Sequence, residues 1–345
     1  MKINKKILWA AIAVAVILCG VGGFFVIRYY LDNKAAGFKQ EYVLYVSPEM
    51  TAQQVTDSLC SVAIRPGSVR RSASRENLAE RIHPGKYLIK PEHQAVYAVR
   101  MVCHGWQTPH KMTLSGTIRT KGAIATKISS QMMVDSLDVA MALEDSTFLA
   151  KYGFTTENVF AMILKDTYEM YWTADIEEIF DRLKKEYDAF WTPERKTAAS
   201  DLGLSPMQVS VMASIVSGET LKEFEYPIIA GVYLNRYRKG MKLQADPTIA
   251  YCYDYTLDRI LKPHLNIDSP YNTYKYVGLP PAPINSPSKE CIDSVLHAQQ
   301  HNYIYFCASP EFNGTHRFAR SYSDHLKNAR EFHRALQARR TAQGL

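Results

Sequence analysis

The sequence lacks the short motifs of several common metal and redox sites. It has six cysteines and ten histidines, but no C-x-x-C pair and no H-E-x-x-H segment. These absences argue against zinc ribbons, thioredoxin-like redox centres and metallopeptidases. His297 and His301 are four residues apart, yet no third metal ligand accompanies them in the sequence. We therefore expect neither a metal nor a cofactor.

The chain also lacks internal repeats, low-complexity segments and any block in which basic and aromatic residues alternate. The missing basic and aromatic block argues against nucleic acid as a partner. Hydrophobic residues make up 47% of the 345 positions, which is too many for extended disorder. This length accommodates at least one large core, and we expect two folded units after the N-terminal segment. The net charge of +7 favours anionic surroundings, such as phospholipid headgroups or an acidic cell-wall polymer.

Charge is absent from the first long segment of the chain. Residues 7–27 carry no charged side chain, and about twenty such residues span the hydrocarbon core of a bilayer. We predict an uncleaved transmembrane helix over residues 7–27. A cleaved signal peptide is the alternative, but the apolar run is long and no small-x-small site precedes Arg28. A lipoprotein at Cys19 is disfavoured because the bulky Leu18 stands directly before it.

Three lysines, Lys2, Lys5 and Lys6, precede this helix. Basic leaders stay on the cytoplasmic side, so residues 1–6 are the predicted cytoplasmic tail. The sequence thus predicts a single-pass protein of the cell inner membrane, in contact with membrane lipid, whose working part is extracytoplasmic (periplasmic). Five of the six cysteines follow the helix, so at least one is free in a monomer; we expect most to be small buried hydrophobes.

A small α+β module is predicted over residues 41–110, after a polar linker of residues 28–40. EYVLYVSP, at the start of this module, has the Val, Leu and Tyr content of a strand. Thr51 and Gln54 form a plausible capping box for a short helix. The alternation recurs, with a strand in HPGKYLIKP and a helix through Val99.

Residues 111–345 form the larger, mixed α+β part of the chain. Residues 175–191 place apolar side chains at helical spacing between Glu and Lys. Ser205, Pro206 and Gln208 are a strong helix start, and the helix that follows contains the segment ASIVSGET. Further elements are predicted from Pro227 (helix), from Tyr303 (strand) and from Ser323 (helix).

One carboxylate in ASIVSGET, Glu219, shares a helix face with Met212 and Ile215. Its position near the last turn adds the partial negative charge of unpaired carbonyl groups. Desolvation and this dipole both favour the protonated acid, and a glutamic acid that is protonated near neutral pH is suited to general acid catalysis. The alternative is an ordinary glutamate at a frayed helix end. Three polar or proline-rich loops follow, LQADPT, PYNTY and GLPPAPINSP, and such loops typically position ligands.

These segments together resemble a known family. ASIVSGET, VYLNRYRKGMKLQADPT, SPYNTY and GLPPAPINSP, followed by YIYF and HRFARSYSDH, are similar to the signature blocks of the YceG-like endolytic murein transglycosylases. LKDTYEMYW is a fainter match. The resemblance implies one N-terminal membrane helix, a small LysM-like module and a C-terminal catalytic domain. The chain departs from the family's usual ASIVEKET by having Ser217 and Gly218 where Glu and Lys are common.

The resemblance implies that Glu219 is the catalytic acid of a lytic transglycosylase. This reaction cleaves the β-1,4 bond after N-acetylmuramic acid, leaves a 1,6-anhydro ring and limits the length of nascent glycan strands. Tyr271 and Asn272 are then predicted to hydrogen-bond the sugar, and Gln244 and Asp246 to line the cleft. Asp246 precedes a proline, so it could instead cap the following turn.

Other points stay open at this stage. His316 and His325 match family positions in the last block and could either brace the fold or contact the substrate. The implied partners are peptidoglycan glycan strands and candidate peptidoglycan synthases. Two other functions are conceivable: a non-catalytic glycan-binding envelope scaffold for cell-wall synthesis, and a true muramidase, which would need a second carboxylate.

Overall fold

The structure, a computed structural model, describes residues 5–342. Lys2 and the rest of residues 1–4 of the predicted tail lie outside the described residues, as do residues 343–345. Helices and short strands are mixed in sequence order, which confirms the predicted α+β class. By their contacts, the residues form two compact units, and each is described below by itself.

Unit 1 comprises the chain up to Lys111 together with Glu169–Ala174, and unit 2 comprises the remainder. The elements of unit 1 are α1 (Lys5–Asn33), β1 (Tyr42–Val46), α2 (Ala52–Val62), α3 (Pro66–Arg75), β2 (Gly85–Ile89) and α4 (Ala95–Cys103). The boundary between the units falls within two paired strands, β3 (His110–Leu114) and β4 (Asp166–Met170).

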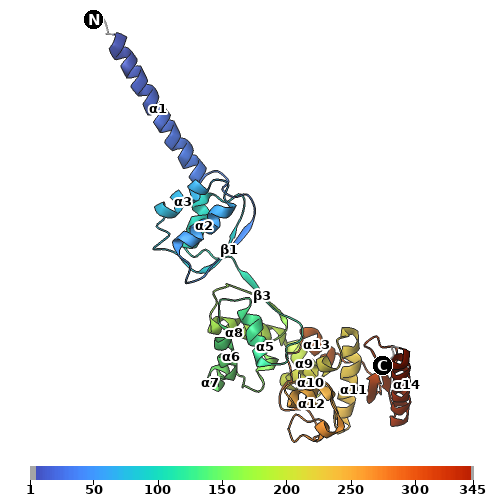
Figure 1. Cartoon of the computed structure of the whole chain (residues 1–345). Coiled ribbons are helices and arrows are strands. Elements are labelled where there is room, and N and C mark those ends of the chain that lie inside the picture. Colours follow the sequence, from blue (N-terminus) through green and yellow to red (C-terminus); the bar gives the residue numbers. More distant parts are fainter. Residues whose placement is uncertain (1–4, 343–345) are drawn as a thin grey trace. The chain divides into compact units, whose positions relative to one another are not determined.

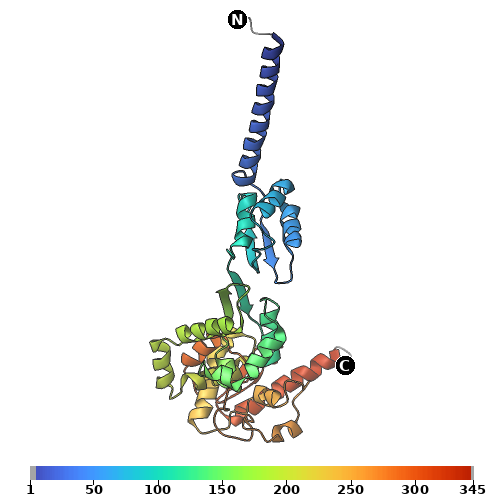
Figure 2. The same ribbon diagram turned by 90° about the vertical axis from the view of Figure 1, so that its left-hand side faces the viewer.

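Helix α1 is one unbroken apolar helix in both views (Figure 1 and Figure 2). Within residues 5–342 it is the one helix long and apolar enough to cross a membrane. It continues past the predicted span, so the first half of the expected linker is helical as far as Asn33. The reason is a tertiary contact: Asp32, near the C-terminal end of α1, is buried and accepts two hydrogen bonds from Arg71 of α3.

In the rest of unit 1, the helices α2, α3 and α4 pack with an antiparallel pair of strands, β1 and β2. Leu44 of β1 pairs with Tyr87 of β2, and the inward-facing residues of both strands are buried. The capping box of Thr51 and Gln54 is present at the start of α2, as predicted. Helix α3 was missed because serines occupy part of its buried face, and Ser72 is fully buried there.

Unit 2 is mostly helical. Its elements are α5 (Lys121–Ser129), α6 (Ser136–Glu144), α7 (Ser146–Ala150), η1 (Val159–Ala161), α8 (Ile176–Phe190), α9 (Pro193–Asp201), α10 (Pro206–Glu219), η2 (Glu223–Glu225), α11 (Tyr226–Arg238), α12 (Asp246–Cys252), η3 (Lys262–Asn266), α13 (Lys289–Leu296), β5 (Tyr305–Ala308), β6 (His316–Ala319) and α14 (Tyr322–Ala342). The antiparallel hairpin of β5 and β6 packs against α14. Figure 1 shows α10 among α9, α11, α12 and α13.

Helix α10 is the central helix of the unit 2 core. It begins with the predicted capping box, in which Ser205 and Gln208 exchange hydrogen bonds. All residues from Val209 to Val216 are buried, so the helix has no solvent face along this length. The hydroxyl groups of its two buried serines are hydrogen-bonded within the protein. Ser214 Oγ, for example, accepts a hydrogen bond from the Ile284 amide. A helix buried on every side positions its last residue, Glu219, rigidly.

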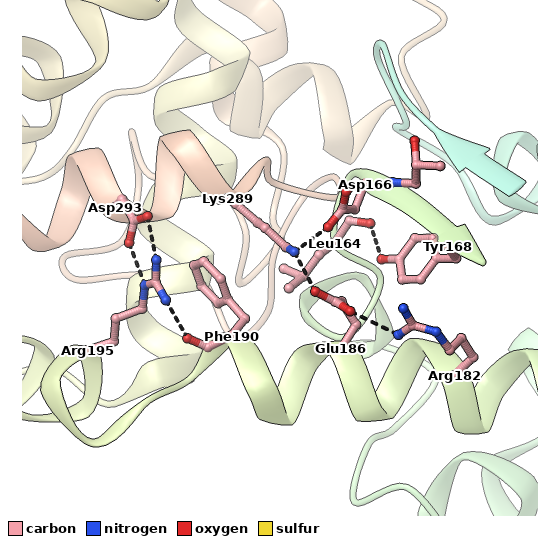
Figure 3. A network of polar contacts seen from close by, with 10 residues as sticks. Leu164, Asp166, Tyr168, Arg182, Glu186, Phe190, Arg195, Lys289 and Asp293 are labelled. Carbon is pink, nitrogen blue, oxygen red and sulfur yellow. Dashed lines mark hydrogen bonds and ion pairs between the residues drawn. The ribbon is translucent and has the colours of Figure 1, made fainter. Parts of the chain in front are cut away.

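A network of charged side chains ties α8, β4 and α13 together at the edge of this core (Figure 3). Lys289 of α13 bonds Asp166 of β4 and also Glu186 of α8, the latter at 2.7 Å. Arg195 forms a bidentate pair with Asp293 at 2.7 and 2.9 Å. These contacts join segments that are about a hundred residues apart in the sequence, and they fix the backbone around residues 164–168.

Candidate active site

Glu219 is the last residue of α10, where the buried helix reaches an open cavity. The cavity has a volume of about 360 Å³. The Tyr233 hydroxyl donates a hydrogen bond of 2.5 Å to Glu219 Oε1. Tyr233 lies on α11, and its ring is buried against Phe306 of β5. The carboxyl group is therefore held in one orientation by a side chain that is itself fixed.

The surroundings of Glu219 favour its protonated form. The pKa of Glu219 is raised to about 8: burial is the largest cause and raises it, the hydrogen bond from Tyr233 lowers it, and the charge of Asp246 raises it. The physical cause is desolvation: Glu219 is half-buried, and a carboxylate that loses part of its hydration is disfavoured relative to the neutral acid. Glu219 is thus a carboxylic acid near neutral pH that can donate its proton to a ligand in the cavity.

Several residues that line this cavity were not predicted from the sequence as site residues. They come from α11, the loops around α12 and the β5–β6 hairpin: Tyr233, Arg236, Leu243, Tyr274, Tyr305, Phe306, Cys307 and Ala308. Arg236 is buried and donates to the carbonyl oxygens of Lys242 and Ile304. The signal that could have found these residues is the resemblance of the segments that contain them, since no local periodicity marks them.

Gln244 and Asp246, both predicted to line the cleft, do line the cavity. Gln244 has a positive φ of 54° and accepts a hydrogen bond from Arg236. Such a backbone conformation is uncommon for a residue other than glycine and is often found at functional sites. Asp246 does not cap α12; it accepts a hydrogen bond of 2.5 Å from the Tyr274 hydroxyl.

Tyr271 and Asn272 were predicted to contact the sugar, but the structure places them behind the cavity wall. Asn272 is fully buried, and its Nδ2 donates to the carbonyl oxygens of Leu265 and Ile267. The ring of Tyr271 packs against Tyr251 at 4.5 Å. The side chain of this loop that reaches the cavity is Tyr274, whose amide is held by Asn272 Oδ1.

The two histidines of the last block both line the cavity. His316 bonds the buried Glu225 through its amide at 2.8 Å and through its ring at 2.9 Å. Glu225 also accepts a hydrogen bond from Thr220, the residue after Glu219. His325 stacks on Tyr305, and burial lowers the pKa of its ring. His316 therefore braces the segment that follows Glu219.

Potential metal ligands do not gather at this cavity. Among residues 5–342, no group of three or more His, Cys, Asp or Glu side chains is arranged to hold an ion. His301 bonds the Ile228 carbonyl and the Tyr303 amide, which gives it a role in packing. Cys60, Cys103 and Cys291 are buried. Every cysteine within residues 5–342 is free.

Gly218, where this chain departs from the family's usual lysine, faces a proline. A Cβ atom added at Gly218 would lie 2.6 Å from Pro247 Cβ and 2.8 Å from Pro247 Cγ. Ser217, the other departure, donates a hydrogen bond to Asn285 Oδ1. Because the proline ring is rigid and follows Asp246 directly, any side chain at position 218 would displace the start of α12.

We expect Gly218→Ala to destabilise unit 2 by about 1 to 3 kcal/mol, the usual cost of overpacking. Denaturant unfolding of the purified chain measures this loss. Gly122→Ala in α5 is the matched control, because nothing lies closer than 4.0 Å to its added Cβ. That substitution should be neutral or stabilising by about 0.5 to 1 kcal/mol. Equal stability of Gly218→Ala and the parent chain would contradict the close approach of Pro247.

Comparison with known proteins points to one family. Residues 44–331 match the sequence profile of the YceG-like family. The chain is 31% identical over 227 residues to an endolytic murein transglycosylase of Bacillus subtilis, covering 60% of this chain and 62% of the relative. It is 28% identical over 243 residues to one of Streptococcus pneumoniae, covering 65% and 43%. This chain therefore spans less than two thirds of the length of either relative.

Among solved structures, a YceG-like protein of Listeria monocytogenes has a similar fold. Its TM-score is 0.57 at 22% identity, with 84% of this chain and 98% of that chain covered. At this identity the likeness concerns the fold alone. The family profile, by contrast, covers most of the chain, including Glu219 and every residue that lines the cavity. The chain belongs to the YceG-like family.

Proposed function

We propose that this protein is a membrane-anchored endolytic lytic transglycosylase that cleaves the β-1,4 bond of peptidoglycan glycan strands. The observation that carries the proposal is Glu219, a carboxylic acid with a pKa of about 8 at the meeting point of open cavities. A general acid must hold its proton at the working pH and reach the leaving oxygen. Similarity to relatives named endolytic murein transglycosylases supports the same assignment.

In the proposed reaction, Glu219 first donates its proton to the glycosidic oxygen as the bond from C1 of N-acetylmuramic acid breaks. The acetamido group of the substrate stabilises the cationic carbon. The Glu219 carboxylate then removes the proton of the C6 hydroxyl group as O6 bonds to C1, closing the 1,6-anhydro ring. The proton lost in the first step is recovered in the second, and no water is consumed.

The neighbouring residues support this cycle in different ways. Tyr233 orients the carboxyl group, and the negative charge of Asp246 adds to the effect of burial in keeping it protonated. Gln244 and Asp246 are proposed to bind the sugar, together with Tyr274. Tyr271 and Asn272 act indirectly in this proposal, since they hold the loop that presents Tyr274.

An endolytic cut requires that the strand continue past the acid in both directions. Glu219 lines three of the cavities of unit 2, with volumes of about 360, 400 and 230 Å³. These cavities meet at Glu219, and the second and third also share Arg119 and Asn285. Sugar units can therefore be accommodated on either side of the cleaved bond.

Mass spectrometry of the products of purified glycan strands tests the proposal. A lytic transglycosylase leaves 1,6-anhydro ends, whereas a muramidase leaves reducing ends that have gained water. Anhydro ends on fragments that were released from the interior of the strands support the proposed reaction. Reducing ends would show that the chain is a hydrolase instead. Strands that remain intact would favour the glycan-binding scaffold.

The remaining parts of the proposal concern location and role. Helix α1 is compatible with a single membrane anchor, and we propose the inner membrane with unit 2 on the periplasmic side. Residues 41–110 of unit 1 are proposed to be the LysM-like module, in which α2 and α3 lie between the paired strands β1 and β2 in sequence order. An enzyme tethered in this way is suited to limiting the length of nascent strands beside peptidoglycan synthases.

The pH dependence of the rate tests whether Glu219 is the general acid, because two substitutions should shift its pKa in opposite directions. The rate should fall above about pH 8, where Glu219 loses its proton. Tyr233→Phe removes a hydrogen bond that stabilises the carboxylate, so the pKa of Glu219 should rise and the alkaline limb should move to higher pH. Asp246→Asn removes a negative charge that disfavours the carboxylate, so the limb should move to lower pH.

The limb of kcat/KM against pH is the measurement, because its position is independent of any general loss of rate. Tyr237→Phe is the control, since it removes a hydroxyl group from the next turn of α11 that makes no bond to Glu219. This control should leave the limb in place. If both Tyr233→Phe and Asp246→Asn moved the limb in the same direction, the assignment of Glu219 as the titrating acid would fail.

A further inference from the structure

The second cavity that meets Glu219, of about 400 Å³, has two cations in its wall. Lys165 and Arg119 line it, together with residues of the loop after α10 and of the segment before α13. Lys165 belongs to LKDTYEMYW, the segment with the fainter family resemblance, to which the proposed reaction assigns no role. All residues that line this cavity belong to unit 2.

Lys165 is half-buried, and within residues 5–342 its ammonium group makes no hydrogen bond and no ion pair. Glu223 lines the same cavity but forms no ion pair with Lys165. Burial is the largest cause and lowers the pKa of Lys165. Cys291 and the exposed Glu290 act in the opposite direction without forming an ion pair with it, and the positive charge of Arg119 acts in the same direction as burial. Lys289 is a contrasting case on the same edge of the core, because it is paired with both Asp166 and Glu186.

The backbone that carries Lys165 is fixed on both sides (Figure 3). The carbonyl oxygen of Leu164 accepts a hydrogen bond of 2.5 Å from the buried Tyr168 hydroxyl, and Asp166 is held by Lys289. Lys165 itself forms a parallel β-bridge with Ser288, which caps α13. The lysine therefore starts from a rigid base beside the cavity.

Arg119 is the second cation of the cavity wall. Its guanidinium group lies 5.0 Å from the centre of the Tyr255 ring and makes no ion pair among the described residues. Two like charges beside one cavity repel each other, and a partly desolvated ammonium group without a partner is unfavourable. An anion that enters from outside would remove both penalties, which is the usual arrangement of a binding site for a carboxylate or phosphate.

We propose that Lys165 and Arg119 form an anion subsite beside Glu219, and that it binds a carboxylate carried by a muramic acid side chain of the glycan strand. This inference rests on the proposed function, because that function supplies a strand with carboxylates on its lactyl ethers. The carboxylate belongs either to the peptide attached to the lactyl group or, on strands without peptide, to the lactyl group itself. Recognition of this charge would place the strand in register with the catalytic acid.

Equilibrium binding in the Glu219→Gln background tests the subsite without turnover. The ligands are soluble glycan strands with free carboxylates, and the same strands after the carboxylates are converted to methylamides. Adding Lys165→Gln should weaken binding of the carboxylate strands about tenfold, because one partly desolvated ion pair is lost. Binding of the methylamide strands should change by less than about twofold. Strands stripped of peptide by an amidase identify the source: retained discrimination points to the lactyl carboxylate, and lost discrimination points to the peptide.

Two further variants separate charge from folding. Lys165→Arg keeps the charge and should retain most of the discrimination. Lys185→Gln removes an exposed lysine of α8 outside the cavity and should change neither affinity. The melting temperature of Lys165→Gln should equal or exceed that of its parent, because an unpaired, partly buried charge has been removed.

The proposal is overturned if Lys165→Gln binds carboxylate strands as tightly as its parent, or if the parent binds both kinds of strand equally. It is also overturned if Lys165→Gln loses affinity for both kinds to the same extent, as a folding defect would cause. Cleavage by the wild-type chain is measured separately. Absence of cleavage together with charge-dependent binding would remove the proposed reaction and leave the subsite standing.

Discussion

Glu219→Gln is expected to lower the rate of glycan cleavage by about a thousandfold or more. The amide cannot donate a proton to the leaving oxygen, nor take one from the C6 hydroxyl group, so both steps of the proposed cycle lose their acid and base. Removal of general acid catalysis alone costs roughly 10² to 10⁴ in rate. The measurement is the rate at which anhydro-ended fragments form from purified strands.

Binding should survive this substitution, because glutamine has the same shape and can still accept a hydrogen bond from Tyr233. Glu194→Gln is the matched control: it changes an exposed carboxylate of α9, away from the cavities, and should keep the wild-type rate. A Glu219→Gln variant that still formed anhydro ends at more than about a tenth of the wild-type rate would refute the assigned role. If wild type and variant both bind strands without cleaving them, the protein is a glycan-binding scaffold and not an enzyme.

Glu225→Ala is expected to destabilise unit 2 by about 3 kcal/mol. The carboxylate of Glu225 is buried and accepts hydrogen bonds from the His316 amide, the His316 ring and Thr220. Its removal leaves these donors without their partner in a mostly buried site, which costs about 1 to 3 kcal/mol for each unsatisfied group, less any relaxation and any water that enters from the cavity. For a unit of this size the melting temperature should fall by about 6 to 12 °C.

Glu225→Gln separates the hydrogen bonds from the charge. The glutamine side chain keeps one carbonyl oxygen for the His316 amide, so it should lose less than half as much stability as alanine does. Glycan cleavage at a temperature where both variants are folded provides the second readout. Because Thr220 follows Glu219 directly, the alanine variant should also lose activity. Full stability and activity of Glu225→Ala would show that the network has no part in holding the site.

Local features of the sequence were sufficient to predict several helices and their first residues. The capping boxes at Thr51 and Ser205 appear in the structure, because a cap involves residues only three positions apart. The end of α11 depends on an equally local signal, because Gly240 lies directly after it and has a positive φ of 64°. Helix α3 escaped prediction because its packing uses buried serines, which leave no apolar periodicity.

At the site, prediction from sequence was partial for a physical reason. The loop PYNTY was identified, but which of its side chains faces the cavity depends on the turn geometry, and that side chain is Tyr274 instead of Tyr271 or Asn272. Tyr233 is separated from Glu219 by almost four turns' length of sequence and meets it only because α10 and α11 pack together. Lys165 reaches the same site from a different segment again.

By itself, then, the sequence determined the apolar N-terminal helix, the helix starts and the placement of an acid at the end of an apolar helix, because each depends on neighbours within a few residues. The tertiary structure alone decided how deeply Glu219 is buried, which hydroxyl group holds it and which cations lack a partner. Desolvation and pairing are set by segments far apart in the chain, and these two effects determine whether a glutamate is a solvent-exposed charge or a proton donor.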